Sequence, residues 1–410
     1  MNFPFARTAP GRTQRRRRWL RATAITTALL VGVGLALWIA IHRVPWLGPA
    51  LADSVRAVVG PKPVAWAENI AYGVQDRLNR WRYQDQAPSS YWQVPQSSNT
   101  AAPVAASPAA SSQASAPVAA ASADRFAPAP FVPPEPSVTA PGDGVWIPMN
   151  ERFSDSGPSA MVKTTVHPDA ERTFSMLAVV AMDLSRIRLH AAAGTHEPVD
   201  STFPAALRTG LIDPTHHDTL IAAFNGGFQT IHGGYGMMVQ GHRIGEPQTD
   251  ACTVAIYPNG TVRIRSWQVL AGETQRMEAY RQTPRCLVEQ GQRHPDLKSR
   301  YNTSWGAVVN GTTVIRRSAL GVSEDGRTLY FGMGDGLTAR SLADGMRAAG
   351  AFDVAQLDIN HAFPRFVLFD KIDAKLQATS ALCSGFSYSP QDYVTEPKKR
   401  DFFFVTRRGG

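Results

Sequence analysis

Short apolar runs bounded by turn residues fill the chain from about residue 144 onward, and this pattern predicts β-strands. Met176 to Leu184 and Leu220 to Phe224 are mostly apolar, which indicates strands buried on both faces. The turn pairs Asn259-Gly260, Asn310-Gly311 and Asp325-Gly326 each follow such a run and predict antiparallel hairpins. The predicted flanking strands are 252–257 with 261–267, 305–309 with 312–316, and 327–333 after the third turn.

One helix is expected within this part of the chain. Thr338 is a good N-cap, Leu342 and Met346 share one helical face, and Gly350 is a typical stop. A strand at 352–358 follows, so 327–333, the helix and this strand can form a crossover unit with Asp358 at a carboxyl end. The predicted fold class is α+β: a β-rich, mostly antiparallel domain over residues 143–410, with few helices.

A helical period governs residues 63–82. Trp66, Ile70, Val74, Leu78 and Trp81 recur every three or four positions, which predicts an amphipathic helix. Its apolar stripe has three possible partners: a membrane surface, an envelope protein, or the chain's own folded domain.

A different hydrophobic segment lies near the N-terminus. Residues 22–41 are 20 uncharged residues, long enough to cross the roughly 30 Å core of a bilayer. Arginines cluster before this segment, which predicts that residues 1–21 stay in the cytoplasm and that the rest is exported. We therefore expect a single-pass protein of the inner membrane with a periplasmic C-terminal domain. The alternative is a signal peptide cleaved after Ala50-Leu51-Ala52.

The segment 87–142 has the composition of a linker. Between residues 101 and 130, 24 of 30 positions are Ala, Pro or Ser, so nothing there can bury a core. We expect an extended, semi-stiff tether that holds the folded domain away from the bilayer.

The net charge of +9 does not indicate a nucleic-acid partner. Residues 1–43 carry eight Arg and no other charged residue, which leaves 34 basic and 33 acidic residues, or +1, for the remainder. The three cysteines are too few and too scattered for a zinc or iron–sulfur framework. In an oxidising compartment Cys252 and Cys286 can pair and leave Cys383 over, whereas buried free thiols are the alternative.

Two glycine-rich loops follow the run 220–224. Asn225-Gly226-Gly227-Phe228 and His232-Gly233-Gly234-Tyr235-Gly236 contain the glycines expected where a backbone approaches another group closely or forms a tight turn. Their spacing fits neither a P-loop nor a dinucleotide fingerprint. No Gly-x-Ser-x-Gly motif supports a serine hydrolase.

The order of several motifs resembles the phosphodiester glycosidase family. These motifs are Phe-Asn-Gly-Gly-Phe at 224–228, Gly-Met-Met-Val-Gln-Gly at 236–241, Arg-Ser-Ala-Leu-Gly at 317–321, Gly-Leu-Thr at 336–338, and Leu-Asp at 357–358. The resemblance covers residues 150 to 408, including a terminal strand at 402–405. The family includes a lysosomal enzyme that uncovers mannose 6-phosphate tags and bacterial proteins linked to exopolysaccharides.

The resemblance implies hydrolysis of a sugar-1-phosphodiester to a free sugar and a phosphomonoester. It carries over at Asn225, Gly226, Gly227, Arg317 and Asp358. The family reads Asp-Gly-Gly-Gly-Ser where this chain has Asp358-Ile359-Asn360-His361-Ala362, and Gln229 replaces a second Phe. These departures change the shape and polarity expected of the pocket.

The matching residues also make chemical sense as a site for an anionic ester. Arg317 and the amides of Gly226 and Gly227 are expected to bind phosphate oxygens, with Asn225, His232 and Asn360 as further substrate-binding residues. Asp358 is the predicted nucleophile or general base, and His361 the group that protonates or orients the leaving phosphate. Asp335 is the candidate second carboxyl, with a turn or cap carboxylate as its alternative.

The histidines leave a metal site open as an alternative. His216-His217-Asp218 and His232 are residue types that bind metals, but no HExxH-like spacing is present. We predict no cofactor and no metal ligands, with a divalent cation bridging phosphate and Asp358 as the alternative.

These features together predict a membrane-anchored, periplasm-facing hydrolase of sugar-1-phosphodiesters in envelope or exopolysaccharide metabolism, with a glycan or sugar-phosphate as its substrate. Two other functions stay open. One is a catalytically inactive carbohydrate- or phosphate-binding module of a polysaccharide assembly. The other is a metal-dependent hydrolase that uses His361 and Asp358.

Overall fold

The computed structural model describes residues 60–93, 126–154, 157–298, 304–306, 313–359 and 362–408, with scattered positions between 21 and 59. The chain divides into two units, Met1–Ala65 and Trp66–Gly410, and the second contains the folded domain. No helix within the described residues is both long and apolar enough to span a bilayer. The predicted segments 1–21 and 22–41 and the central part of the predicted linker lie almost wholly outside these residues.

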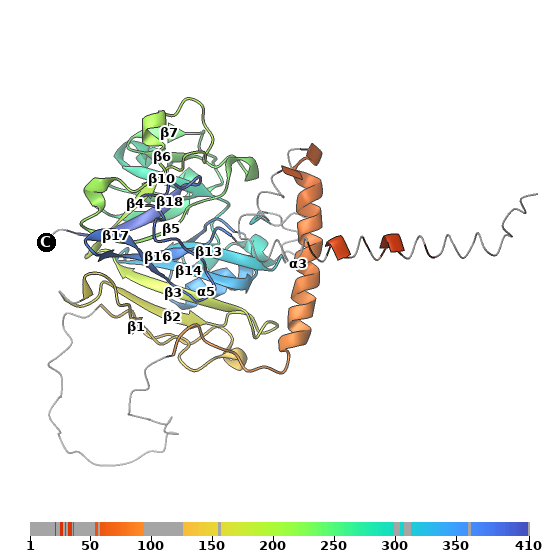
Figure 1. The fold of residues 1–410 in the computed structure, drawn as a ribbon. Helices are drawn as coiled ribbons and strands as arrows, with labels where there is room; N and C mark the ends of the chain where they lie inside the picture. The colour runs from red at the N-terminus through yellow and green to blue at the C-terminus, as the bar shows by residue number, and fades with distance from the viewer. Residues whose placement is uncertain are drawn as a thin grey trace, which may run out of the picture. The chain divides into compact units, whose positions relative to one another are not determined.

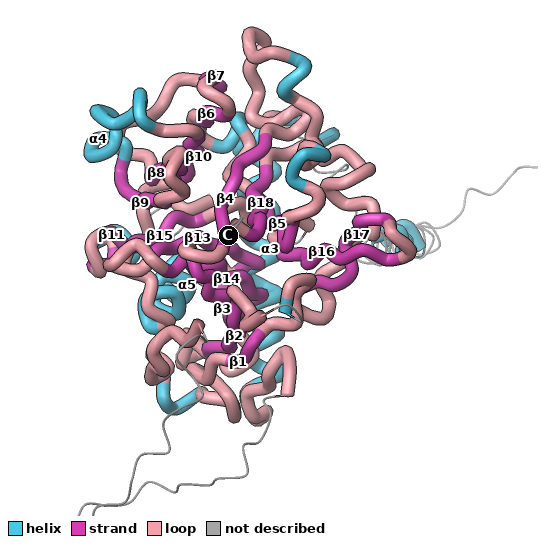
Figure 2. Tube along the Cα trace, turned by 90° about the vertical axis from the view of Figure 1, so that its left-hand side faces the viewer, coloured by secondary structure: helices cyan, strands magenta, loops and turns pink. Residues whose placement is uncertain are grey.

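Three antiparallel sheets build the domain (Figures 1 and 2). Sheet A has eight strands in the order β1 (Ile147–Pro148), β2 (Met161–Val166), β3 (Met176–Asp183), β14 (Thr328–Leu337), β13 (Ile315–Val322), β15 (Asp353–Gln356), β11 (Val288–Glu289) and β12 (Gln292–Arg293). Sheet B has the order β17 (Lys375–Ala381), β16 (Phe366–Ile372), β5 (Leu220–Asn225), β18 (Phe402–Arg407) and β4 (Ile187–Ala192). Sheet C has the order β7 (His242–Ile244), β6 (Met237–Val239), β10 (Ala279–Thr283), β8 (Cys252–Ile256) and β9 (Val262–Ser266).

Few helices accompany these sheets in the described part of the chain. The α-helices are α3 (Pro61–Tyr83), α4 (Trp267–Leu270) and α5 (Ala339–Ala348). Short 3₁₀ turns are η1 (Pro136–Val138), η3 (Ala205–Leu207), η4 (Pro214–His216), η5 (Thr230–His232), η6 (Ala271–Arg276) and η7 (Pro295–Lys298). The predicted α+β class, rich in antiparallel strands, is thus confirmed.

The central strand β3 is buried on both faces, as its sequence predicts. Ala178, Val180 and Met182 belong to the main core, which also contains Phe224 and Phe403 of sheet B. The alternate side chains of β3 belong to a second core that also contains Leu342 and Met346 of α5. These residues are Leu177, Val179 and Ala181. Because side chains alternate between the two faces of a strand, β3 contributes apolar side chains to both cores.

The predicted helix–strand unit is present with one strand inserted. Thr338 caps α5 by accepting a hydrogen bond from the Ser341 amide at 2.9 Å, and Gly350 follows with φ of 108°. Strands β14 and β15 both pair antiparallel with β13, which lies between them. They therefore run parallel to each other across β13, and Asp358 follows β15 at its carboxyl end.

The predicted hairpins at Asn259-Gly260 and Asp325-Gly326 are confirmed as β8–β9 and β13–β14. The Asn310-Gly311 turn lies outside the described residues. Cys252 and Cys286 form the disulfide that was one of two alternatives, with an S–S distance of 1.99 Å, and Cys383 is a buried free thiol.

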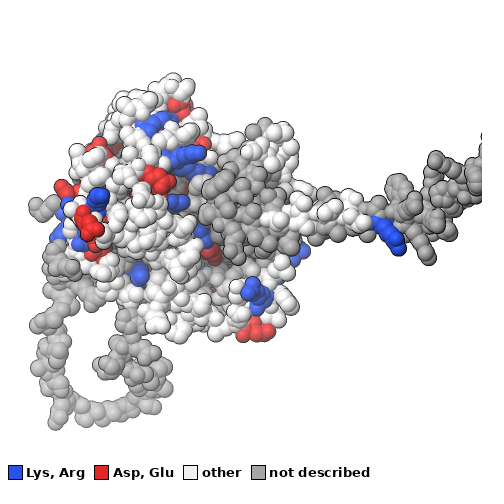
Figure 3. Space-filling model, viewed as in Figure 1, with Lys and Arg blue, Asp and Glu red and all other residues white. Residues whose placement is uncertain are grey.

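The end of the predicted linker packs on the domain. Val138 and Ala140 are buried, and the indole of Trp146 donates to the Ala129 carbonyl at 3.2 Å. The prediction of an extended tether is therefore wrong for residues 126–142, which pack on the domain. Phe131 and Val138 offer apolar side chains that an Ala/Pro/Ser tract lacks. On the face shown in Figure 3, acidic and basic side chains of described residues are interspersed, as expected for a domain near neutrality.

Candidate active site

Loops from sheets A and B meet beside Asp358. The Asp358 amide donates to the Gly226 carbonyl at 2.9 Å, and its own carbonyl accepts from Ser318 Oγ on β13 at 3.0 Å. Ser318 Oγ also accepts from Asn225 Nδ2 at 2.9 Å. The structure thus brings the predicted Asn225 loop and Asp358 together, through a serine that the sequence interpretation did not select.

Asn225 is a positioning residue in this arrangement. It ends β5 and is buried, and its side-chain oxygen accepts from the Arg365 amide at 3.2 Å while its Nδ2 reaches Ser318. Because both ends of the amide are engaged within the protein, Asn225 holds the loop rather than presenting a free donor to a substrate.

The two glycines allow a carboxylate to approach the backbone. The Gly226 amide donates to the Asp401 carbonyl at 3.1 Å, and the Gly227 amide donates to Asp401 Oδ2 at 2.9 Å. A Cβ on Gly226 would lie 2.1 Å from Asp401 Oδ2, and one on Gly227 would lie 2.8 Å from Cζ of Arg281. The predicted phosphate contact of these amides is therefore not what the structure shows, since Asp401 already accepts both hydrogen bonds.

Arg281 and Asp401 form a buried ion pair behind this loop. Arg281 Nε donates to Asp401 Oδ2 at 2.8 Å, and both side chains are almost fully shielded from solvent. The same guanidinium donates to the Phe228 carbonyl at 2.6 Å and the Tyr235 carbonyl at 2.9 Å. This single side chain of sheet C thereby fixes both glycine-rich loops, since its charge and its hydrogen bonds are satisfied only in this geometry.

Asp358 is the carboxyl group best suited to chemistry here. Its side chain is 5% exposed, and it accepts from the Ile359 amide at 2.9 Å and from Arg400 NH1. Burial raises the pKa of Asp358 to about 6, while the Arg400 cation opposes this rise and Asp401 adds to it. A carboxyl with a pKa near 6 changes its ionisation within the range where enzymes work.

Arg400 is the cation at this carboxyl. Its guanidinium carbon lies 3.2 Å from the ring centroid of Phe363, and its side chain is 18% exposed. A guanidinium has five donors, so it can hold Asp358 and still bind an anionic oxygen. Arg400 is therefore the guanidinium beside Asp358, where the sequence interpretation expected Arg317.

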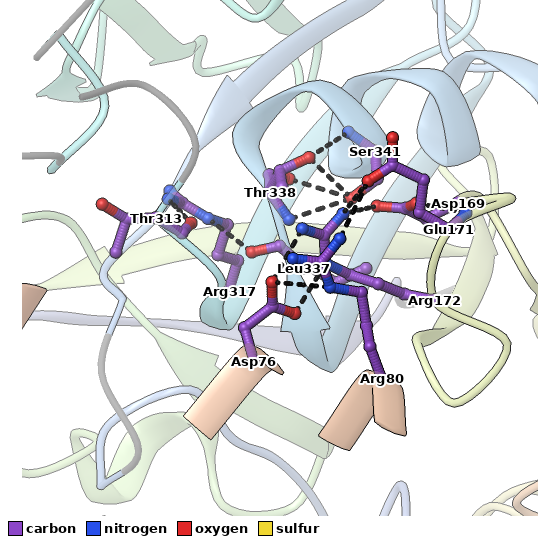
Figure 4. Close-up of polar contacts among 10 residues, drawn as sticks. All are labelled: Asp76, Arg80, Asp169, Glu171, Arg172, Thr313, Arg317, Leu337, Thr338 and Ser341. Carbon is purple, nitrogen blue, oxygen red and sulfur yellow. Dashed lines mark hydrogen bonds and ion pairs between the residues drawn. The ribbon is translucent and has the colours of Figure 1, made fainter. Parts of the chain in front are cut away.

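Arg317 lies on the other face of β13. Its guanidinium is fully buried and donates to the carbonyls of Leu337 and Thr313 at 3.0 and 2.9 Å, both shown in Figure 4. It also donates at 2.9 Å to the Trp305 carbonyl and to Gln356 Oε1. Burial lowers the pKa of Arg317 to about 9. Arg317, the predicted phosphate ligand, therefore binds groups of the protein itself. Side chains alternate along a strand, so Ser318 lies toward Asp358 and Arg317 lies away from it.

Asp335 pairs with a neighbouring arginine rather than with the Asp358 group. Its carboxylate accepts from Arg316 Nε at 2.6 Å and from NH2 at 2.9 Å, and its side chain is 47% exposed. Arg316 also stacks on the Phe386 ring at 3.8 Å. The structure therefore gives Asp335 an ion-pair contact in place of the predicted role as second catalytic carboxyl.

The predicted histidine and asparagine positions have different outcomes. His232 is exposed at the end of η5, where the loop is held by Glu197 through the Thr230 amide and hydroxyl, each at 2.9 Å. Asn360 and His361 lie outside the described residues. No group of three His, Cys, Asp or Glu side chains suited to a metal ion occurs in the described part of the chain.

Sequence reasoning missed Arg281, Ser318, Arg400 and Asp401. Arg400 and Asp401 directly precede the apolar strand 402–405, and Asp401 pairs with a strand far away in sequence. A charged pair immediately before an apolar strand was the available signal. The partners of these two residues, Asp358 and Arg281, could not be inferred, because nothing local in the sequence indicates that the segment before β18 lies beside them.

Comparison with known proteins confirms the predicted resemblance over part of the chain. Residues 218–358 match the model of the phosphodiester glycosidase family. This stretch contains Asn225, Ser318 and Asp358. No curated protein matches the chain.

Solved structures show only a distant likeness. The catalytic domain of zebrafish N-acetylglucosamine-1-phosphodiester alpha-N-acetylglucosaminidase, auto-inhibited by its pro-peptide, is 12% identical with a TM-score of 0.40, over 63% of this chain and 87% of that one. A hypothetical protein from Synechocystis is 11% identical with a TM-score of 0.38, over 61% and 62% of the two chains. A putative exported protein from Burkholderia pseudomallei is 11% identical with a TM-score of 0.25, over 61% and 75%.

Proposed function

We propose that this protein hydrolyses sugar-1-phosphodiesters, with Asp358 and Arg400 at the reacting bond. The observation that carries the proposal is the contact between the Asp358 carboxylate and the Arg400 guanidinium beside the Asn225 loop. Asp358 also lies within the stretch that matches the phosphodiester glycosidase model.

The chemistry follows from the charges of the two groups. Hydrolysis breaks the bond between the anomeric carbon and the phosphate oxygen, and its electron pair leaves with the phosphate. Water supplies the new hydroxyl of the sugar, and its remaining proton goes to the phosphomonoester. The ionised Asp358 carboxylate stabilises the positive charge that develops at the anomeric carbon, and Arg400 binds the departing phosphate. A phosphate leaves with little help from a second acid, so one carboxyl group suffices.

The test compares Asp358→Asn with Asp335→Asn in the full chain, using a UDP-linked sugar or a chromogenic sugar phosphodiester. Asp358→Asn is expected to lower kcat/KM by about 100-fold or more, because it removes the anionic form. Asp335→Asn, which disrupts an ion pair of similar composition at Arg316, is expected to change kcat/KM by less than about threefold. Equal losses in both variants would contradict the assignment, and loss of wild-type turnover with a chelator would indicate the metal-dependent alternative.

A non-catalytic binding module is the second candidate. It is favoured by the low exposure of Asp358, whose two oxygens already accept hydrogen bonds from Arg400 and Ile359. Isothermal titration with the same phosphodiesters distinguishes the two functions. Saturable binding that Arg400→Gln abolishes, without turnover of any tested compound, would establish the module.

We further propose that the domain faces the periplasm and acts on envelope or exopolysaccharide sugar-phosphates. The uncharged run 22–41 and the Cys252–Cys286 disulfide support this location, since disulfides persist in oxidising compartments. Fusions at the C-terminus to alkaline phosphatase and to a cytoplasm-dependent fluorescent protein test it. Only the phosphatase fusion should be active.

A further inference from the structure

Helix α3 presents large apolar side chains to solvent. Trp66, Ile70, Val74, Leu78 and Trp81 are 58%, 47%, 50%, 58% and 72% exposed. These five residues, the apolar stripe of α3, are the same ones that the sequence pattern selected. An exposed stripe of this kind marks an interaction surface rather than a part of the core.

The helix contacts the domain through its opposite side, which carries Asp76, Arg80 and Tyr83. Asp76 is buried and accepts from Arg172 Nε at 2.8 Å and from Arg172 NH2 at 2.9 Å (Figure 4). Nε of Arg80 lies 3.3 Å from Oδ2 of Asp76, and its NH1 lies 3.4 Å from Oε2 of Glu171. The bidentate contact between Arg172 and Asp76 fixes the rotation of α3 about its axis, so the apolar stripe stays outward.

The geometry of the stripe favours a flat partner. At about 100° per residue, its five positions spread over an arc of about 120°, whereas a coiled-coil seam is narrower and alternates steps of three and four. The observed steps are four, four, four and three. A second copy of the helix would therefore leave part of the stripe uncovered, and a planar surface would not.

The charge of the outward side favours an anionic partner. Arg77, within the arc of the stripe, and Arg82, beside it, are both exposed, while Asp76 is buried against Arg172. Tryptophan at both ends of the stripe suits the boundary between headgroups and acyl chains. An amphipathic helix with these features binds in the plane of an anionic bilayer surface.

We propose that α3 lies on an anionic lipid bilayer through its apolar stripe, with Arg77 and Arg82 at the headgroups. The inference rests on the membrane location proposed above. The bilayer then contacts the domain at a fixed side, independently of the segment 22–41.

Site-specific labelling of the reconstituted full chain tests the proposal. Single cysteines at Val74 in the stripe and at Gln75 beside it are labelled with an environment-sensitive fluorophore, which is feasible because Cys252 and Cys286 are bonded and Cys383 is buried. The vesicles contain phosphatidylcholine and phosphatidylglycerol with brominated acyl chains. Quenching at position 74 should exceed that at 75 by about threefold, and it should fall in vesicles of phosphatidylcholine alone.

A third label at Leu30 separates this proposal from the one on which it rests. Strong quenching at 30 with equal, weak quenching at 74 and 75 would overturn the surface contact and leave the membrane anchor standing. A label at 74 that is shielded from aqueous iodide but not quenched by brominated lipid would assign the stripe to a protein partner and overturn the proposal. Absence of quenching at all three positions would overturn both.

Discussion

The pKa of Asp358 reflects its burial, the Arg400 cation, the Asp401 carboxylate and the hydrogen bond from the Ile359 amide. Burial raises the pKa to about 6, so the proposed active anion forms as the pH rises through this value. We expect kcat/KM to increase about tenfold per pH unit below pH 6 and to level off above it.

Substitution at Arg400 should move this pH profile. Since the guanidinium lowers the pKa of Asp358 against the effect of burial, Arg400→Gln should shift the midpoint to higher pH. Arg400→Lys retains the positive charge and should shift the midpoint less. Profiles of kcat/KM between pH 4 and 9 measure both effects. An activity that falls through pH 6 would assign Asp358 the role of general acid instead.

Gly226 should tolerate no side chain. A Cβ would lie 2.1 Å from Asp401 Oδ2 and 2.5 Å from its carbonyl oxygen. We expect Gly226→Ala to lower the free energy of unfolding by about 3 kcal/mol, because the loop must move off the buried Asp401–Arg281 pair. Gly272→Ala is the matched control, since its Cβ would have no atom within 4 Å. Urea denaturation should show a change of at most about 0.5 kcal/mol for the control.

At the scale of elements, α3 is held by the Asp76–Arg172 pair and by the contact between the rings of Tyr83 and Phe174. Its described apolar stripe is exposed, so the Asp76–Arg172 pair is a main attachment to the domain. Asp76→Ala should raise amide exchange rates along α3 on the order of 100-fold, since Arg172 loses a bidentate partner. The strands of sheet A should keep their protection.

Hydrogen exchange measured by mass spectrometry provides this comparison. Gln75→Ala changes an exposed neighbour of Asp76 and should leave exchange in α3 near the wild-type rate. Unchanged protection of α3 in Asp76→Ala would show that other contacts hold the helix.

The sequence predicted single elements better than their contacts. The strands at 176–184 and 220–224, the capped helix and two hairpins follow from local patterns, and all are present. The position of β13 between β14 and β15 could not be predicted, because nothing in a strand's own sequence specifies its neighbours. The same reason explains why the sequence interpretation placed the guanidinium of Arg317 in the site. Arg316 and Arg317 are adjacent, and only the register of β13 determines that the second faces α5.

At the scale of the whole molecule, a disulfide connects two sheets. Cys252 is in β8 of sheet C, and Cys286 precedes β11 of sheet A by two residues. The bond closes a sequence separation of 34 residues. Replacing both cysteines with Ala should lower the free energy of unfolding by about 3–4 kcal/mol, mainly because the unfolded chain gains freedom.

Guanidinium denaturation of the oxidised and reduced protein tests this prediction. Reduction of the wild type should reproduce the loss seen in the double variant. Cys383→Ala, which removes the buried free thiol and no crosslink, should cost less. A wild type whose stability is unaffected by reductant would show that the bond contributes little.

Strand β18 pairs with β5 across a long interval of sequence, with Phe402 opposite Asn225. Arg400 and Asp401 enter the site on the segment that leads into this strand. During synthesis, the edge of β5 that pairs with β18 therefore stays unpaired until residues near 400 have emerged from the ribosome. The hydrolysis proposed at Asp358 therefore requires that this late segment has already paired with β5, because it delivers Arg400.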